Sequence, residues 1–262
     1  MTEREYRASE GVSRSELWML HTSPEKFKYL REHPPEPTPA LIFGTAVHKL
    51  LLEPDTFKDE FAVAPEVDRR TKAGKEEWAE FCAKTEGKTV IESTQFHTCV
   101  DMVDVCLTNP NVVELLKGDH EMPLRWTDEV TGEVCKARVD VWNPEYKMII
   151  DYKTTTNADT AAFARSAINY GYDFQAAMYC EGLRHVKGAD AKFVFIAQEK
   201  DPPYAVNVMA VGWDVMSRGR DLYRDLLDRY HDCKESGDWY GYLGKLNIMN
   251  TLTLPGWADA EF

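Results

Sequence analysis

The stretch Ala137-Arg138-Val139-Asp140, followed by Met148-Ile149-Ile150-Asp151-Tyr152-Lys153-Thr154, decides the fold of this chain. The pattern predicts two adjacent β-strands, because Met148-Ile149-Ile150 is a short apolar run of the buried-strand type and polar residues begin where it ends. Residues 143–146 (Asn-Pro-Glu-Tyr) form the expected turn between the strands. That turn would pair residue 140 with 149 and residue 138 with 151.

The expected hairpin gathers charged side chains on one face. Side chains of a strand alternate with period two, so Asp151 and Lys153 share a face and Tyr152 points away. In the expected register Asp140 lies diagonal to Asp151 on that face, about 7–8 Å away. Two repelling acids need a counter-charge, and hard oxygen ligands favour Mg²⁺ or Mn²⁺. A surface hairpin with solvated charges is the ordinary alternative, because a D-x-K pattern is common.

The composition favours a packed globular protein. With 262 residues, of which 44% are hydrophobic, the chain can bury the core of one large domain spanning residues 1–262. Within it, residues 1–12 are expected to be loose and residues 237–262 to form an irregular tail. The longest apolar stretch, residues 40–47, is too short to span a membrane. The charged start lacks a signal-peptide core, which favours a cytoplasmic protein.

The charge distribution limits the class of partner. A net charge of −13 argues against indiscriminate binding to polyanions. Residues 1–50, however, carry seven basic and seven acidic side chains, against 24 and 37 in the remainder. A local nucleic-acid surface is therefore compatible with an acidic total. The most basic window of the chain is residues 69–75, within a charged segment that covers 65–90.

The remaining patterns predict helices and strands in a mixed order. Ser13 with Glu16 three residues later is a capping box that begins a helix, and Ser23-Pro24 breaks it. Further helices are expected at 40–52, 92–117, 159–186 with an interruption at 169–171, and 213–233. Strands are expected at 121–126, 133–142, 147–153, 192–199 and 204–212. This order fits an α/β (α+β) fold with a central mixed β-sheet flanked by helices.

Two helical patterns add polar side chains. His48 ends a G-x-x-x-H pattern that begins at Gly44. Gln175 and Tyr179 are four residues apart and so share one face of a helix. Taken singly, the histidine favours a structural role and the Gln-Tyr pair favours packing.

Taken in order, these patterns resemble those of the PD-(D/E)xK nuclease superfamily. The G-x-x-x-H, D, D-x-K and Q-x-x-x-Y elements of that pattern correspond here to Gly44–His48, Asp140, Asp151–Lys153 and Gln175–Tyr179. Further segments resemble the C-terminal nuclease domain of exonuclease VIII (RecE) and its phage relatives; they are Ser13-Arg14-Ser15, Ser23-Pro24 and the stretches 137–140, 170–179, 237–242 and 254–257. The resemblance covers about residues 12–258.

The resemblance implies a PD-(D/E)xK restriction-endonuclease-like core with a defined activity. The implied enzyme is an Mg²⁺-dependent, ATP-independent exodeoxyribonuclease that degrades linear double-stranded DNA 5′→3′ and leaves 3′ single-stranded tails for recombination. Mn²⁺ is the expected substitute for Mg²⁺. The resemblance also implies a ring-shaped homo-oligomer, expected to be a tetramer, that works with a single-strand annealing recombinase (RecT-like) in a bacterial or phage-infected cell.

The cysteines disfavour one branch of this superfamily. Some relatives hold an iron–sulfur cluster with four cysteines, three of them clustered near the C-terminus. Of the six cysteines here, only Cys233 lies late in the chain. We therefore expect no iron–sulfur cluster. The absence of any C-x-x-C pair also gives no signal for a zinc site or disulfides.

The residue types suggest which side chains hold the metal. Asp140 and Asp151 are the expected carboxylate ligands. His48 would complete the set, with the backbone carbonyl of Tyr152 as a further ligand. Glu121, on the neighbouring strand, is a candidate outer ligand.

The remaining site residues would act on water, phosphate and DNA. Lys153 would position or deprotonate the attacking water and neutralise charge that develops on phosphorus. Gln175 and Tyr179 are expected to orient the site or the DNA. Two other functions stay open: a restriction-type or structure-selective endonuclease, and a catalytically inactive DNA-binding or assembly protein. The complete Asp140, Asp151 and Lys153 set disfavours the inactive form.

A 5′-phosphate site is expected at Ser13, Arg14 and Ser15. These residues begin a helix, whose free backbone N–H groups and positive dipole end suit a phosphate. Arg14 adds a guanidinium that can grip two phosphate oxygens. An ordinary capped helix is the alternative.

Overall fold

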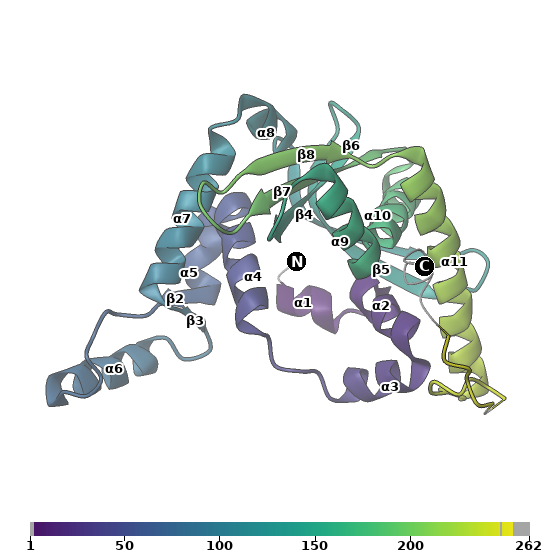
Figure 1. Cartoon of the computed structure of the whole chain (residues 1–262), viewed down its shortest axis with the longest axis horizontal. Coiled ribbons are helices and arrows are strands. Elements are labelled where there is room, and N and C mark those ends of the chain that lie inside the picture. Colours follow the sequence, from purple (N-terminus) through teal and green to yellow (C-terminus); the bar gives the residue numbers. More distant parts are fainter. Residues whose placement is uncertain (1–2, 247, 254–262) are drawn as a thin grey trace, which may run out of the picture.

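The computed structural model describes residues 3–246 and 248–253 and is built on a six-stranded mixed β-sheet (Figure 1). Its strands are β1 (Val12–Ser13), β4 (Asp119–Thr127), β5 (Val134–Asn143), β6 (Met148–Thr155), β7 (Lys192–Glu199) and β8 (Val206–Ala210). The order is β1-β5-β6-β7-β8, with β4 also paired to β5. β6 and β7 are parallel, as are β1 and β5, and the other pairs are antiparallel.

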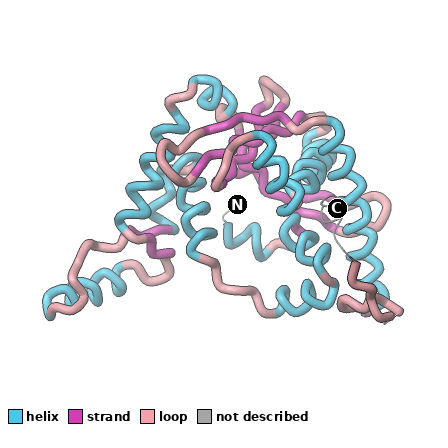
Figure 2. Tube along the Cα trace, in the orientation of Figure 1, coloured by secondary structure: helices cyan, strands magenta, loops and turns pink. Residues whose placement is uncertain are grey.

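Helices cover both faces of this sheet (Figure 2). On one side lie α2 (Arg14–Thr22), α3 (Pro24–Glu32), α9 (Thr160–Tyr170), α10 (Tyr172–Lys187) and α11 (Trp213–Ser236); on the other lie α4 (Pro39–Leu52), α7 (Ser93–Leu107) and α8 (Pro110–Leu115). Each side has its own hydrophobic core. Ile149 packs in the first core and Ile150 in the second, as the period-two alternation of a strand requires. The expected central mixed sheet flanked by helices is confirmed.

The hairpin that carries the D-x-K pattern forms, but its register differs from the prediction by two residues. The observed β5–β6 pairs are Val141 with Ile150, Trp142 with Ile149 and Asn143 with Met148. Asn143 ends β5, and its side-chain oxygen accepts a hydrogen bond from the Tyr146 backbone N–H at 3.2 Å, so the turn lies one residue later than expected. Continuing the pairs puts Asp140 level with Asp151 rather than diagonal to it. The alternation of β5 breaks at Asp140, because Val139 packs in the first core and Val141 in the second.

The N-terminal residues are not loose as predicted, because residues 3–8 form helix α1 (Glu3–Ala8). Its last carbonyls are satisfied from far along the chain. The buried ammonium of Lys136 on β5 donates to the carbonyl oxygens of Tyr6, Arg7 and Ser9 at 3.3, 3.1 and 2.6 Å. A cation at a helix C-terminus is stabilising, and no local sequence pattern announces one supplied from residue 136.

The capping box at Ser13 is confirmed. The Ser13 hydroxyl oxygen accepts from the Glu16 N–H, and the Glu16 carboxylate accepts from the Ser13 N–H at 2.8 Å. The break at Ser23-Pro24 separates α2 from α3. The single helix expected at 92–117 is wrong, since Pro110 divides it into α7 and α8.

The segment between α4 and α7 projects from the body (Figure 1). It contains η1 (Pro54–Thr56), α5 (Phe57–Glu60), α6 (Lys72–Lys84) and a small parallel sheet of β2 (Phe61–Val63) and β3 (Thr89–Ile91). At the other end of the chain, the described residues after Ser236 form neither helix nor strand. Residues 254–257, part of the sequence resemblance, lie outside the described residues. Among those described, no helix is both long and apolar enough to cross a membrane.

Candidate active site

Three acidic side chains stand level on three neighbouring strands. Met122 pairs with Val139 and His120 with Val141, so Glu121 of β4 lies opposite Asp140 of β5. Asp151 of β6 lies level with Asp140 on the other side of β5. The fold therefore brings together the two predicted aspartates and the candidate outer ligand from separate strands.

The backbone pairing opens where these acids lie. The β5–β6 ladder stops at Val141 and Ile150, and the Asp140 carboxylate accepts a hydrogen bond from the Tyr152 N–H at 3.0 Å. The N–H and C=O of one residue in an extended strand point to the same edge. The Tyr152 carbonyl consequently faces the edge where Asp140 lies, as its predicted role as a ligand requires. The phenol hydroxyl of Tyr152 donates a hydrogen bond to the side-chain oxygen of the buried Gln198 at 2.6 Å.

Glu121 is held in an unusual backbone conformation. Its φ is +50°, a left-handed conformation that few non-glycine residues adopt and that recurs at functional sites. The Arg138 guanidinium lies 2.6 Å from its carboxylate and fixes it. The sequence prediction did not include Arg138. Its spacing of two from Asp140 on the same strand was the available signal.

His48 reaches the acids from α4. Its Nε2 lies 2.9 Å from an Asp140 oxygen and its Nδ1 lies 3.3 Å from a Glu121 oxygen. One ligand atom from each of these three residues lies within 4.8 Å of the others. Gly44, one turn earlier, faces β6: a Cβ built there would lie 3.4 Å from the Thr154 hydroxyl. That distance is an ordinary van der Waals contact, so Gly44 lies where α4 packs directly on β6, one turn before His48.

The charges of this group shift one another. Burial lowers the pKa of His48, but the charge and hydrogen bond of Asp140 and the charge of Glu121 outweigh it and raise that pKa to about 9. Burial raises the pKa of Glu121 to about 7, opposed by the charge of His48. For Asp140 burial also raises the pKa, yet His48 and Lys153 lower it below its ordinary value. At neutral pH a protonated His48 imidazole thus lies beside the Asp140 carboxylate, while Glu121 is only partly ionised.

Asp151 occupies a second, more deeply buried position. It is 1% exposed; one carboxylate oxygen lies 2.6 Å from the Lys153 ammonium and the other accepts from the Gln175 amide of α10. Burial raises the pKa of Asp151 to about 6, against the charge of Lys153. Burial lowers the pKa of Lys153, but Asp151 and Asp140 raise it above its ordinary value. The structure therefore joins Asp151, Lys153 and Gln175 as predicted.

Lys153 and Arg14 both lie beside the aromatic ring of Tyr172. The Lys153 ammonium lies 5.1 Å from the centre of the Tyr172 ring, and the Arg14 guanidinium lies 5.8 Å from the same ring. Arg14 also packs over Trp18 and donates to the Tyr170 carbonyl. Burial lowers the pKa of Arg14. The Tyr172 ring thus contacts both Arg14 and Lys153.

The other residues of the predicted phosphate site and Tyr179 are placed differently. The Ser13 hydroxyl lies 2.7 Å from the Glu16 carboxylate and 3.2 Å from the Ser15 hydroxyl, so Ser13 is committed to the cap. Tyr179 lies one turn beyond Gln175 and packs against Phe193 with ring centres 6.3 Å apart. Burial raises its pKa well above the ordinary value. Roles for these residues remain predictions.

The donor set fits a divalent cation. The side-chain oxygens Oε1 of Glu121 and Oδ2 of Asp151 are buried, and their neighbours are the cationic groups already described, His48 at 3.3 Å and Lys153 at 2.6 Å. Such oxygens are costly unless a cation neutralises them. Carboxylate oxygens with one imidazole nitrogen suit Mg²⁺ or Mn²⁺. Glu121, Asp140 and His48 would hold the ion, with Asp151 and the Tyr152 carbonyl beside them.

Comparison with known proteins identifies the class. The model of a family described as a PDDEXK-like domain of unknown function matches residues 13–251. The chain therefore belongs to this family and, through it, to the PD-(D/E)xK nuclease superfamily. No curated protein sequence matches.

One of two similar solved structures shares the fold of the whole chain. A crystal structure described as a "Putative exonuclease" from Eubacterium rectale has a TM-score of 0.66 and 13% identity, over 100% of this chain and 98% of that one. A phage related exonuclease from Haemophilus somnus 129PT has a TM-score of 0.33 and 14% identity, over 89% of this chain and 100% of that one. The first similarity supports the PD-(D/E)xK fold over the whole chain.

Proposed function

We propose that this chain is a divalent-metal-dependent exodeoxyribonuclease that degrades linear double-stranded DNA. One observation carries the proposal: Glu121, Asp140 and Asp151 lie level on three strands, between His48 on one side and the Lys153–Gln175 pair on the other. A phosphodiester needs negative charge neutralised as water attacks phosphorus. The name of the Eubacterium rectale structure supports the choice of an exonuclease.

The residues divide the work according to their surroundings. A bound divalent cation would polarise the phosphate and lower the pKa of water. Lys153 would donate a hydrogen bond to the attacking water or to a phosphate oxygen, since its ammonium already lies 2.6 Å from Asp151. Gln175 holds the other Asp151 oxygen and so fixes the direction of that carboxylate. Arg138 does the same for Glu121.

The test compares linear and covalently closed circular duplexes of the same sequence, with Mg²⁺ and with EDTA. An exonuclease digests the linear DNA alone, and only with Mg²⁺. Cutting of the circle would instead identify an endonuclease. Binding without cleavage of either substrate would identify an inactive DNA-binding protein. Both of these results contradict the proposal.

We also infer that Arg14 recognises the 5′-phosphate of the DNA end. Its Nε is buried and has no hydrogen-bond acceptor among the described residues, and the Tyr172 ring joins it to Lys153. A 5′-phosphorylated duplex should be digested faster than its 5′-hydroxyl counterpart, and Arg14→Ala should remove most of the difference. Equal wild-type rates on the two ends would contradict this role.

Direction, assembly and partner extend the proposal on the basis of the sequence resemblance. We infer 5′→3′ degradation that leaves 3′ tails, a ring-shaped homotetramer and a single-strand annealing recombinase as partner. Strand-specific end labels test the direction. Sedimentation tests the tetramer, and co-purification with a single-strand annealing recombinase tests the partner. Loss of the 3′-terminal label first, a monomer at assay concentration, or no co-purification would contradict the respective inference.

A further inference from the structure

The segment between β2 and β3 stands away from the body of the molecule (Figure 1). We call residues 65–88 the α6 arm. Gly74 is the one buried residue in this segment, so α6 has no side chain in either hydrophobic core. An isolated helix of 13 residues is marginal in water. Its stability must therefore come from contacts within the arm.

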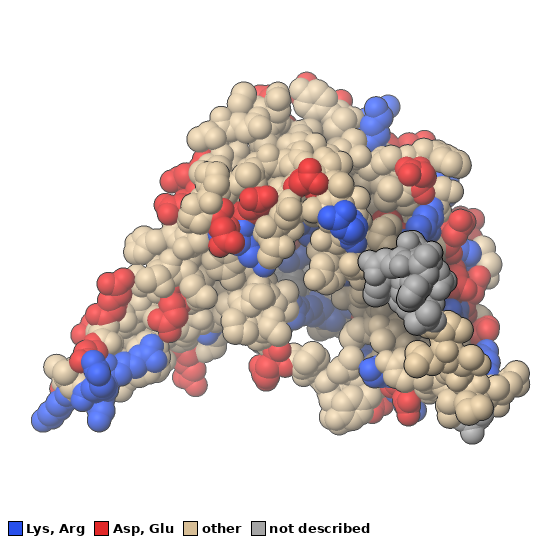
Figure 3. Space-filling model, in the orientation of Figure 1, with Lys and Arg blue, Asp and Glu red and all other residues tan. Residues whose placement is uncertain are grey.

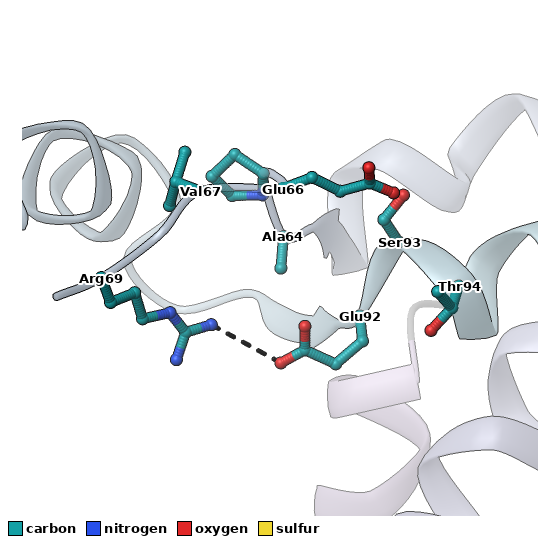
Figure 4. A pocket seen from close by; sticks show the side chains of 8 residues that line it. Ala64, Glu66, Val67, Arg69, Glu92, Ser93 and Thr94 are labelled. Atoms are coloured by element: carbon teal, nitrogen blue, oxygen red, sulfur yellow. Dashed lines mark ion pairs between the residues drawn. The ribbon is translucent and has the colours of Figure 1, made fainter. Parts of the chain in front are cut away.

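Arg69 supplies the main contact that fixes the arm. Its guanidinium lies 3.3 Å from the centre of the Trp78 ring, and Trp78 packs against Phe81. Arg69 also pairs with Glu92 at 3.6 Å, across a pocket of about 540 Å³ at the root of the arm (Figure 4). The Thr71 hydroxyl oxygen caps α6 by accepting from the Gly74 N–H at 3.0 Å. Arg69 is thus a structural residue, engaged on both sides.

The other basic residues of the arm face solvent. The side chains of Arg70 and Lys72 are 91% and 90% exposed, and Lys75 is exposed as well. Among the described residues, Lys75 has no carboxylate within ion-pair distance, and Lys72 has only Glu76 at 3.9 Å. Figure 3 shows Lys and Arg atoms gathered at the lower-left end of the molecule, where Figure 1 draws α6.

The spacing places two exposed lysines on one side of the arm. Lys72, Lys75, Ala79 and Cys82 follow at intervals of three, four and three residues, so they share one side of α6, which we call its basic face. Glu76 borders this face, four residues from Lys72, whereas Glu77 and Glu80 lie further round the helix. Lys75 and the small side chains beside it present a surface that a polyanion can approach closely.

The arm is also close in sequence to the helix that carries a residue of the candidate active site. It is joined through β2, α5 and η1 to α4, the helix that carries His48. Figure 3 shows the molecule hollowed between the α6 arm and α3, with Lys and Arg atoms inside the hollow. We propose that the basic face of α6 grips the phosphate backbone of a DNA duplex whose end occupies the candidate active site. This inference rests on the proposed function and adds a second DNA contact to it.

A backbone contact of this kind has a measurable signature. Each phosphate neutralised by a lysine releases counterions and contributes about 0.9 to the slope of log K against log salt concentration. Lys72→Gln/Lys75→Gln should therefore lower the slope by about 1.8 and weaken binding about 10- to 100-fold at 0.1 M salt. The effect should be independent of sequence, because phosphate contacts carry no base information.

The experiment measures fluorescence anisotropy of a labelled 40-base-pair duplex in EDTA, with NaCl varied from 50 to 200 mM. The matched control is Lys187→Gln/Lys192→Gln, which removes the same charge from exposed lysines outside the arm. We expect the arm variant, and not the control, to lose slope and affinity. As the duplex is shortened, the affinities of wild type and arm variant for it should become equal.

Two results would overturn the inference, and they are distinguishable. If wild type cleaves linear DNA but the arm and control variants have the same salt slope, the α6 arm is not a DNA contact and the proposed function stands. If wild type neither binds nor cleaves a duplex, the proposed function fails and the arm contact fails with it. Circular dichroism at 222 nm checks that the arm variant is folded, and Lys72→Arg/Lys75→Arg, which keeps both charges, should retain the wild-type affinity and salt slope.

Discussion

Asp151 is the residue whose surroundings say most about the site. Its carboxylate is almost fully buried, and burial at that depth is unfavourable unless cations neutralise the charge. Asp140 and Lys153 complete the same electrostatic group. Asp140→Asn, Asp151→Asn and Lys153→Met should each reduce digestion of linear duplex by at least about 100-fold, in keeping with loss of a charge-stabilising group. A variant that is folded and digests at near the wild-type rate would contradict the role of that residue.

His48 makes the metal requirement dependent on pH. Because its pKa is raised to about 9 and that of Glu121 to about 7, a cation that binds them must displace protons at neutral pH. The Mg²⁺ concentration for half-maximal activity should therefore fall as pH rises from 6 to 9. His48→Ala should raise that concentration at every pH and flatten the dependence above pH 7. An unchanged Mg²⁺ titration in this variant would mean that His48 is structural.

Residue patterns identified much of this site before the structure. Period-two alternation predicted the shared face of Asp140, Asp151 and Lys153. The resemblance to the nuclease superfamily, and not spacing by itself, implied His48 and Gln175. The close grouping of Glu121 with His48 did not follow, because it depends on the left-handed backbone at Glu121 and on register across two ladders. Local sequence does not encode either.

At the scale of elements, ion pairs tie the turn between β4 and β5 to α11, where Glu133 pairs with His231 and Lys234, and Asp128 pairs with Arg224. Asp128 directly follows β4 and is buried, and Arg224 of α11 donates to both of its oxygens at 2.8 and 3.1 Å. Thr131 donates to the same carboxylate. Burial raises the pKa of Asp128, but these hydrogen bonds outweigh it and lower the pKa from 3.8 to about 2. A bidentate arginine pair of this kind joins the sheet to the helix layer.

The stability that this pair contributes should depend on pH in a defined direction. A carboxylate with a lowered folded-state pKa stabilises the fold above its unfolded pKa, near 3.8, and the contribution is lost as pH falls through about 2. Asp128→Asn should cost about 2 kcal/mol at pH 7 and about half of that at pH 3 by urea unfolding. The exposed Asp225–Arg229 pair is the control, and Asp225→Asn should cost less than about 0.5 kcal/mol. Equal costs for the two variants would contradict this account.

Elements were predictable where the signal was local and not where a distant residue decided. The Ser13 capping box, the break at Ser23 and the interruption before Tyr172 are all local, and each was found. Helix α1 depends on Lys136, which lies more than 125 residues later. The sequence of α6 shows a charge pattern but no apolar stripe that would predict a helix, because its aromatic side chains pack around Arg69 rather than on a core. The hairpin register depended on whether Asn143 belonged to the strand or to the turn.

At the scale of the whole molecule, the three carboxylates come from three strands, and their helical partners His48 and Gln175 lie on opposite sides of the sheet. A cation that binds this group therefore stabilises the folded chain as a unit. The unfolded chain separates Glu121, Asp140 and His48 and offers no such site. Binding to the folded state alone adds about 2.7 kcal/mol when the free metal is about 100 times its dissociation constant.

This linkage predicts a shift in the melting temperature that requires no activity. For a chain of this size about 2.7 kcal/mol corresponds to roughly 5–10 °C, so Mg²⁺ or Mn²⁺ should raise Tm by that amount over EDTA. Glu121→Gln and Asp140→Asn should abolish the shift, because each removes a charged oxygen from the group within 4.8 Å. Asp128→Asn lowers stability outside the site and should keep the shift intact. A Tm shift that survives Asp140→Asn would place the metal elsewhere, because only a cation held by these carboxylates depends on their charge. The same Tm for wild type in Mg²⁺, Mn²⁺ and EDTA would exclude a bound metal.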